Sequence, residues 1–145
     1  VIAGETAAVD SAVAKLTELG KRSVKLAVSA AFHTKLMQPA ADEFKASISA
    51  FKFGKPDSCY YANLYGKLLE DFTDMPSYLA AHICSPVRFA DELESMSAAG
   101  IEAFVELVPN KVLTGLVKKT LRGAVAVNIE NNETLEKALA ALCGK

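Results

Sequence analysis

The sequence predicts an α/β fold with a largely parallel sheet, because helical and strand-like hydrophobic patterns alternate along the whole chain. Two apolar runs, residues 103–108 and 124–129, have the length of buried strands, and each is followed by a helical pattern. The clearest helical face consists of Val9, Val13, Leu16 and Leu19. Gly20 comes directly after that face, at a place where glycine commonly ends a helix.

The remaining elements follow from local signals for helix starts, helix stops and turns. In chain order, the prediction is a strand remnant at residues 1–3, a helix at 6–19, a strand at 24–28, a helix from Pro39 to Ile48, a strand at 58–63, a helix at 74–83, a helix between Ser85 and Gly100, a strand at 103–108, a helix at 111–120, a strand at 124–129 and a helix at 132–142. Ser85 is the expected N-cap of the helix that Pro86 begins. A turn is expected near Gly66, with Asn63 as a turn former.

Length, composition and charge limit the class of protein. With 145 residues, the chain fits one domain with a core of its own. Apolar residues make up 51% and charged residues 23%, which is a globular rather than a disordered composition. The 16 basic and 17 acidic residues give a net charge of -1, so the chain has no strong positive field to attract nucleic acid.

Targeting and redox signals favour a soluble protein of the cytoplasm. No uncharged apolar stretch reaches the roughly 20 residues of a membrane span, and the longest candidate, residues 75–87, contains a histidine. The first residues carry no secretory signal and read as a chain cut within a strand. Cys59, Cys84 and Cys143 are widely spaced and form no C-x-x-C pair, so neither disulfides nor a metal site is expected.

His33 is the strongest candidate for chemistry. It follows Phe32 in an irregular connection, and an imidazole with a usual pKa of about 6.5 suits a general base near neutrality. A base needs a nucleophile, and the chain contains no G-x-S-x-G segment. Walker, G-x-G-x-x-G and H-E-x-x-H motifs are also missing from the sequence, which excludes the commonest nucleotide-binding and metalloprotease patterns.

The other polar residues have simpler interpretations. His82 fits a core or surface histidine, and its spacing from Cys84 places the two side chains on different helix faces, which does not suit a metal pair. The acidic pairs Asp42–Glu43 and Asp91–Glu92 are expected on the solvated faces of their helices.

Four segments carry a more specific pattern. They are V-I-A-G at residues 1–4, V-S-A-A-F-H-T-K-L-M at 28–37, S-P-V-R-F at 85–89 and F-V-E-L-V-P-N-K-V-L-T-G-L at 104–116. In this order they resemble the malonyl-CoA:acyl carrier protein transacylases of fatty acid synthesis and the related acyltransferase domains of polyketide synthases. The resemblance spans the whole chain but only about the C-terminal half of a family member.

The resemblance implies a division of the fold. Residues 1–29 would form the C-terminal part of a ferredoxin-like small subdomain, and residues 30–145 the C-terminal part of an α/β-hydrolase-like core with a parallel sheet. The family's G-H-S-x-G serine, its arginine for the malonyl carboxylate and its glutamine-bearing loop do not occur in this sequence. We therefore expect a missing N-terminal segment to supply the nucleophilic serine.

The resemblance also implies roles for individual residues. His33 would be the general base, and the main-chain carbonyl of His82, where the family usually has glutamine, would orient its ring. Phe32 matches a phenylalanine of malonyl-selective domains, since its ring leaves no room for an α-methyl group; its alternative role is that of a core side chain. Val108 and Asn110 would line a loop at the substrate, although Val108 stands where the family usually has glycine.

The implied reaction moves a malonyl group from coenzyme A to the phosphopantetheine thiol of an acyl carrier protein through a serine acyl-enzyme. Malonyl-CoA and the carrier protein are the expected partners, and no bound cofactor is expected. The expected location is the cytoplasm, or an organelle of fatty acid synthesis in a eukaryote. Two alternatives are a non-catalytic fragment or carrier-protein docking module without the nucleophile, and an independent small-molecule-binding α/β domain.

Overall fold

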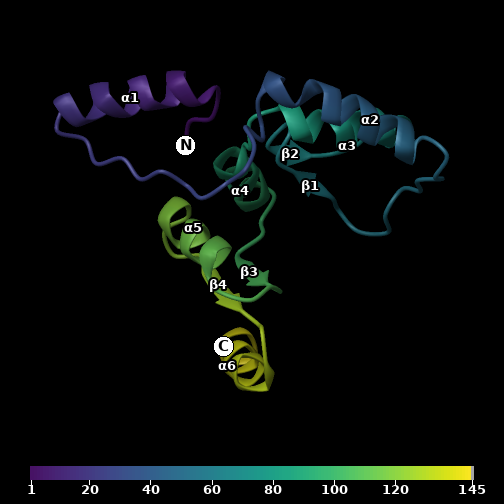
Figure 1. Ribbon diagram of the computed structural model, residues 1–145. Coiled ribbons are helices and arrows are strands. Elements are labelled where there is room, and N and C mark those ends of the chain that lie inside the picture. The colour runs from purple at the N-terminus through teal and green to yellow at the C-terminus, as the bar shows by residue number, and fades with distance from the viewer. Residues whose placement is uncertain (145) are drawn as a thin grey trace. The chain divides into compact units, whose positions relative to one another are not determined.

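The computed structural model describes residues 1–144, and the chain divides into two compact units, one of residues 1–56 with 70–87 and one of residues 57–69 with the chain from Arg88 onward. The first unit contains α1 (Thr6–Glu18), the 3-10 turn η1 (Lys35–Met37), α2 (Gln38–Ile48) and α3 (Met75–Cys84) (Figure 1). The second contains β1 (Tyr61–Ala62), β2 (Lys67–Leu68), α4 (Phe89–Ala98), β3 (Ala103–Glu106), α5 (Val112–Thr120), β4 (Val125–Asn128) and α6 (Asn132–Cys143). No helix within residues 1–144 is long and apolar enough to cross a membrane.

The helix α1 confirms the helix predicted at residues 6–19 and ends one residue earlier than expected. Gly20 follows with a left-handed φ of 68°, and the Lys21 N–H closes the last turn by donating to the Leu16 carbonyl at 2.8 Å. None of the residues of α1 is buried in the described structure. The apolar face that predicts this helix therefore has no covering layer within residues 1–144.

Residues 24–28 form no strand, so that prediction is wrong, and the same is true of residues 1–3. A strand needs a neighbouring strand for its N–H and C=O groups. Both sheets of the described residues are formed by other segments. Val24, Leu26 and Val28 are exposed, which shows that an alternating pattern predicts the capacity to form a strand but not the presence of its partner.

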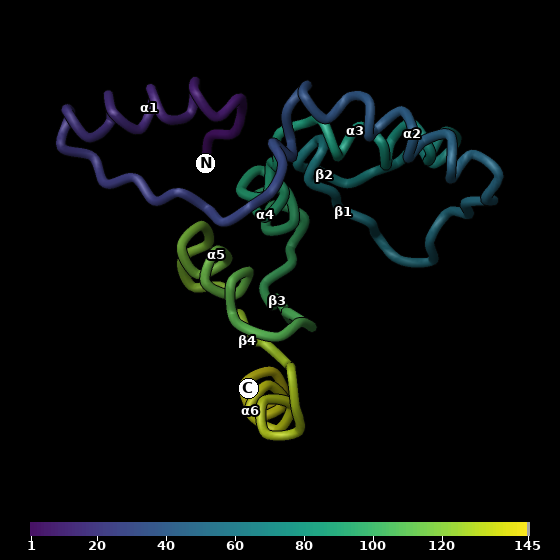
Figure 2. Tube along the Cα trace, viewed as in Figure 1, coloured from purple at the N-terminus to yellow at the C-terminus, as the bar shows by residue number. Residues whose placement is uncertain are grey.

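The helices α2 and α3 pack against each other and form the core of the first unit (Figure 2). Pro39 lies in the first turn of α2, as predicted, where its missing N–H costs no helical hydrogen bond. Asp74, where the predicted helix begins, caps α3 by accepting a hydrogen bond from the Ser77 N–H at 3.1 Å. The buried residues of these helices are Ala41, Met75, Tyr78 and Ala80.

The strands β1 and β2 form an antiparallel hairpin in place of the longer strand predicted at residues 58–63. Gly66, in the connecting turn, has a φ of 63°, and a Cβ at this position would lie 2.6 Å from the Asp91 Cβ. The Gly66 N–H donates to the Ala62 carbonyl at 3.0 Å. Because only glycine fits this turn without strain, the predicted turn near Gly66 is confirmed.

The strands β3 and β4 run parallel, with Phe104 opposite Ala126. This pair confirms the predicted parallel pairing and is the one parallel pair within residues 1–144. Leu93 of α4, Val117 of α5 and Ala126 of β4 form a buried cluster, and partly buried apolar residues surround it. This cluster therefore joins α4 and α5 to the two-stranded sheet.

The helix α4 begins at Phe89 rather than at Pro86, so the N-cap role predicted for Ser85 is wrong. Ser85 is extended, with φ of -107° and ψ of 150°, a backbone that an N-cap also adopts. The predicted role fails because residues 86–88 are not helical, so Ser85 ends α3 without starting α4. Gly100 has a φ of 88° two residues beyond α4, which confirms the predicted helix stop.

Candidate active site

His33 lies in the connection between α1 and η1, and its backbone has a left-handed φ of 64°. Histidine adopts this conformation more often than most residues with a side chain. The His33 N–H donates to the Ile83 carbonyl at 2.9 Å, and its side chain is exposed. Thr34 closes the same turn by donating its hydroxyl to the Ala31 carbonyl at 2.7 Å. These contacts hold the imidazole at the surface of the unit.

Two main-chain carbonyls hold the inner nitrogen of this ring. The His33 Nδ1 lies 3.0 Å from the His82 oxygen and 3.1 Å from the Ser85 oxygen. A carbonyl oxygen only accepts hydrogen bonds, so Nδ1 must carry the hydrogen. The lone pair of the neutral ring is then on Nε2, which is the arrangement a general base requires. The structure thus brings together His33 and the carbonyl of His82; their catalytic roles stay predictions.

The side chain of His82 is partly buried on α3. Its ring stands edge-on to the Tyr78 ring, with centroids 4.8 Å apart and an interplanar angle of 75°. The buried Nε2 of His82 has no hydrogen-bond partner within the described residues. Burial, and after it the repulsion from the nearby His33, lowers the pKa of His82 below its usual value. Burial therefore favours the neutral form of the His82 imidazole over the charged form.

The lowered pKa of His82 predicts a pH-dependent stability. Because the unfolded histidine has the higher pKa, the unfolded chain binds a proton first as pH falls. The contribution of neutral His82 is fully present above about pH 6.5 and is lost below it. Urea unfolding of the parent chain and of His82→Gln, measured from about pH 8 to about pH 5, should give curves that diverge below about pH 6.5, with the parent losing more stability. Parallel curves would contradict this prediction.

Phe32 precedes the histidine and is 50% exposed. Phe32 is therefore not a core side chain within residues 1–144, because half of its surface is exposed. An exposed aromatic ring beside the candidate base can contact a bound acyl group. The role of Phe32 in substrate selection stays a prediction.

Val108 and Asn110 lie in the second unit, in the loop between β3 and α5. Asn110 has the left-handed φ of this loop, at 75°, whereas Val108 has no positive φ. The Asn110 N–H donates to Glu130 Oε2 at 2.8 Å, and its carbonyl accepts from Asn128 Nδ2 at 3.0 Å. Val108 lines a hollow of about 370 Å³ between this loop and the start of α6, and Asn110 does not line it. A β-branched residue is therefore compatible with the loop, because the left-handed position falls on asparagine.

Glu106 organises the same loop. Its buried carboxylate accepts hydrogen bonds from the Leu113 N–H, the Thr114 N–H and the Thr114 hydroxyl, at 2.9, 2.8 and 2.6 Å. The Thr114 hydroxyl foremost, together with the two amides, lowers the pKa of Glu106. Glu106 thus ties the end of β3 to the first turn of α5. The signal in the sequence is a single carboxylate within an otherwise apolar strand.

Glu92 is a correction to the sequence analysis. The pair Asp91–Glu92 is expected on a solvated face, but Glu92 is only 7% exposed, and its Oε2 has no partner within the described residues. Burial raises the pKa of this carboxyl above its usual value. Glu92 is buried next to Leu93 in α4, whereas Asp91, the other member of the pair, is exposed as expected.

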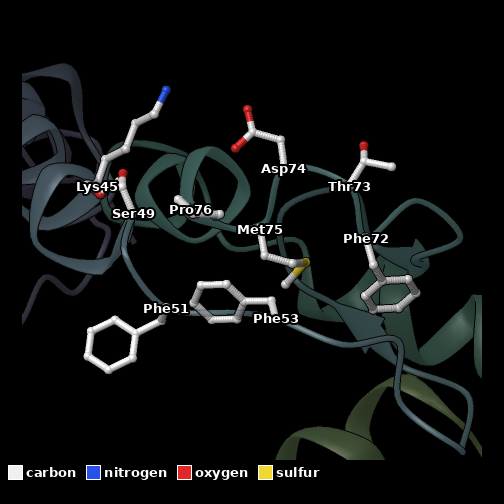
Figure 3. Close-up of a pocket in the computed structure, with 9 residues that line it drawn as sticks. All are labelled: Lys45, Ser49, Phe51, Phe53, Phe72, Thr73, Asp74, Met75 and Pro76. Atoms are coloured by element: carbon white, nitrogen blue, oxygen red, sulfur yellow. Dashed lines mark hydrogen bonds between the residues drawn. The ribbon is translucent and has the colours of Figure 1, made fainter.

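A second hollow, of about 340 Å³, lies in the first unit and is shown in Figure 3. Phe51, Phe53 and Phe72 provide its aromatic walls, and Lys45 and Asp74 point outward at its rim (Figure 3). None of the predicted site residues lines it. No three histidine, cysteine, aspartate or glutamate side chains of residues 1–144 gather closely enough to hold a metal ion.

The described chain is thus an α/β structure that presents an exposed imidazole whose Nδ1 is held by two main-chain carbonyls. The acyl transferase domain family matches residues 1–140, and the chain belongs to this family.

Several relatives make the comparison more specific. The malonyl CoA-acyl carrier protein transacylase of Bacillus subtilis is 34% identical over 143 residues, which cover 98% of this chain and 45% of that protein. The crystal structure of the Clostridium perfringens transacylase superposes with a TM-score of 0.92 at 31% identity, over 97% of this chain and 45% of that one. A malonyl-transacylase solved in complex with a type II polyketide synthase acyl-carrier protein gives a TM-score of 0.87 at 29% identity, over 98% and 45%. The chain thus has the α/β fold of these enzymes and spans about 45% of their length.

Proposed function

We propose that this chain supplies the general base, His33, to a malonyl transfer from coenzyme A to the phosphopantetheine thiol of an acyl carrier protein. The observation that carries the proposal is the pair of carbonyls at Nδ1, which leaves the exposed ring with a free Nε2 lone pair. The relatives named malonyl CoA-acyl carrier protein transacylase support the substrate class. The complex of one relative with an acyl-carrier protein supports the partner.

The chemistry has two balanced halves. The serine hydroxyl attacks the malonyl thioester while Nε2 of His33 takes its proton, the carbon–sulfur bond breaks, and the coenzyme A thiolate receives that proton. The carrier's thiol then gives its proton to Nε2 and attacks the serine ester, whose carbon–oxygen bond breaks as serine regains a proton. The Nδ1–H bonds to the two carbonyls keep the ring in place through both halves. No bound cofactor takes part; coenzyme A leaves with the first half.

The nucleophilic serine of this reaction is not among these 145 residues, because they contain no G-x-S-x-G segment. We propose that it lies in the polypeptide that corresponds to the other part of the relatives' fold, of which this chain spans about 45%. In that arrangement, residues 1–29 complete a ferredoxin-like small subdomain, and residues 30–145 complete a hydrolase-like core. The two compact units of this chain do not divide at residue 29. The boundary between the two proposed subdomains at that residue therefore stays a prediction. Val108 and Asn110 would then line the substrate loop.

The deciding experiment measures a malonyl label. Incubated with radiolabelled malonyl-CoA, this chain alone should take up no label, because no acyl-enzyme forms without a nucleophile. Addition of a polypeptide with the family's serine segment should restore labelling and transfer to a carrier protein. Label on the chain alone would overturn the proposal.

The second candidate is a carrier-protein docking module without turnover. The sequence observation that favours it is the missing G-x-S-x-G segment. Such a module should bind a carrier protein with the serine-bearing polypeptide present or absent, and it should never support labelling. Binding without labelling in both samples would therefore replace the transferase proposal.

Phe32 gives a prediction on substrate choice. In the reconstituted transferase, Phe32→Ser should lower the preference for malonyl-CoA over methylmalonyl-CoA by about tenfold or more, since one methyl-sized clash is worth about 1 to 3 kcal/mol. The measurement is the ratio of kcat/KM for the two thioesters. Phe51→Ser is the matched control, because Phe51 is an exposed phenylalanine of the same unit that lines the separate hollow. An equal change in both variants would show that the position of Phe32 has no special role.

A further inference from the structure

Two carbonyls in the last turn of α3 accept hydrogen bonds from a residue outside the helix. The last turn of any helix leaves carbonyl oxygens without an intrahelical donor. At the end of α3, the His82 oxygen accepts from the His33 imidazole and the Ile83 oxygen accepts from the His33 backbone N–H. His33, 49 positions before His82 in the chain, therefore acts as the cap of this helix. The orientation of the candidate base depends on where α3 stops.

Pro86 determines where α3 stops. Cys84 is the last residue of the helix, and Ser85 is extended, as expected of a residue that precedes proline. In a continuing helix, the Ser85 carbonyl would point along the helix axis with the others. The extended backbone turns this carbonyl instead onto Nδ1 of His33, at 3.1 Å. The second acceptor of the ring is thus a consequence of the proline.

We propose that Pro86 is a positioning residue for His33: it holds Ser85 extended, so that the Ser85 carbonyl joins the His82 carbonyl at Nδ1 and fixes the ring as the Nδ1–H tautomer. The inference rests on the proposed function for its effect on transfer, but its structural part stands apart from any turnover. Pro86 touches no reacting atom in this account and acts only through Ser85. The side chain of Ser85 has no part in it, because the contact is made by the main chain.

The structural test is the tautomer of His33, read from its ring nitrogens by 15N NMR at a pH well above the usual histidine value of about 6.5. The chain has only two histidines, so His82→Gln assigns the signals. The parent should show one protonated and one unprotonated nitrogen for His33. Pro86→Ala should move the two shifts toward each other, as the ring exchanges between tautomers. Pro76→Ala, a proline in the first turn of the same helix, should leave them unchanged.

Two further variants keep the test decisive. Ser85→Ala should match the parent, since it retains both the carbonyl and the proline. Ser85→Gly relaxes the backbone with Pro86 still present, and it should move the shifts in the same direction as Pro86→Ala, even if Pro86→Ala unfolds the chain. Unchanged shifts in a folded Pro86→Ala chain, or a change in Ser85→Ala equal to that in Ser85→Gly, would overturn the proposal.

The kinetic arm uses the chain together with the serine-bearing polypeptide. Loss of one hydrogen bond to the ring in Pro86→Ala should lower kcat about fivefold to tenfold with little change in KM, because the ring acts in the transfer step and not in binding. Pro76→Ala should keep the parent values. An absence of transfer in all samples would contradict the proposed function alone, whereas equal kcat values for the two proline variants would contradict the role of Pro86.

Discussion

Replacement of His33 by asparagine is expected to lower malonyl transfer at least about 100-fold in the protein reconstituted with its serine-bearing part. General base catalysis contributes about 10² to 10⁴ in rate, and asparagine has no lone pair that can take the serine proton. Asparagine suits this position otherwise: it tolerates the left-handed backbone of residue 33, and its amide N–H can donate to the carbonyls that now bind Nδ1. The variant should therefore fold like the parent and fail in transfer.

Two measurements make this result interpretable. Urea unfolding of His33→Asn should match that of the parent, whereas His33→Ala should be less stable, since alanine lacks the donor and disfavours a φ of 64°. Glu133→Gln, which removes an exposed ion pair on α6, is the activity control and should transfer at the parent rate. Full activity in His33→Asn would show that another group is the base.

The largest loss of stability is expected from Leu93→Ala. Leu93 is 1% exposed, and it packs with Val117 and Ala126 at the centre of the second unit. Removal of a fully buried leucine side chain costs about 2 to 5 kcal/mol, because the lost transfer free energy is increased by the cavity left behind. The free energy of unfolding in urea should fall by that amount.

Leu139→Ala is the matched control for this experiment. Leu139 belongs to α6 of the same unit and is 50% exposed, so its truncation should change the free energy of unfolding by less than about 1 kcal/mol. Similar losses in the two variants would mean that Leu93 is not the centre of a packed core.

Local signals predicted most helices because their causes lie within a few residues. Pro39, Asp74, Gly20 and Gly100 act through their own backbone geometry or through the next turn, and each is found in its predicted role. The two failures have different causes. Residues 24–28 have a strand pattern, but no strand from elsewhere in the described chain pairs with them. Ser85 caps no helix because residues 86–88 are not helical and α4 begins only at Phe89.

In the candidate site, too, the sequence indicated individual residues but not the contacts between distant parts of the chain. A connection with an irregular pattern and a family resemblance indicated His33 and Phe32, and both side chains are exposed. Sequence spacing gave no sign of the Ser85 carbonyl at the ring, nor of the three hydrogen bonds that Glu106 receives from the start of α5. Glu92 was misplaced because a carboxylate next to another carboxylate usually indicates a solvated face.

By itself, the sequence determined that this is an α/β chain of the acyl transferase domain family and that His33 is its candidate base. The tertiary structure alone decided how that base is held, through carbonyls 49 and 52 positions away in the chain. The physical reason is that helix caps and turns depend on neighbours along the chain, whereas a ring nitrogen is oriented by whichever acceptors the fold brings to it.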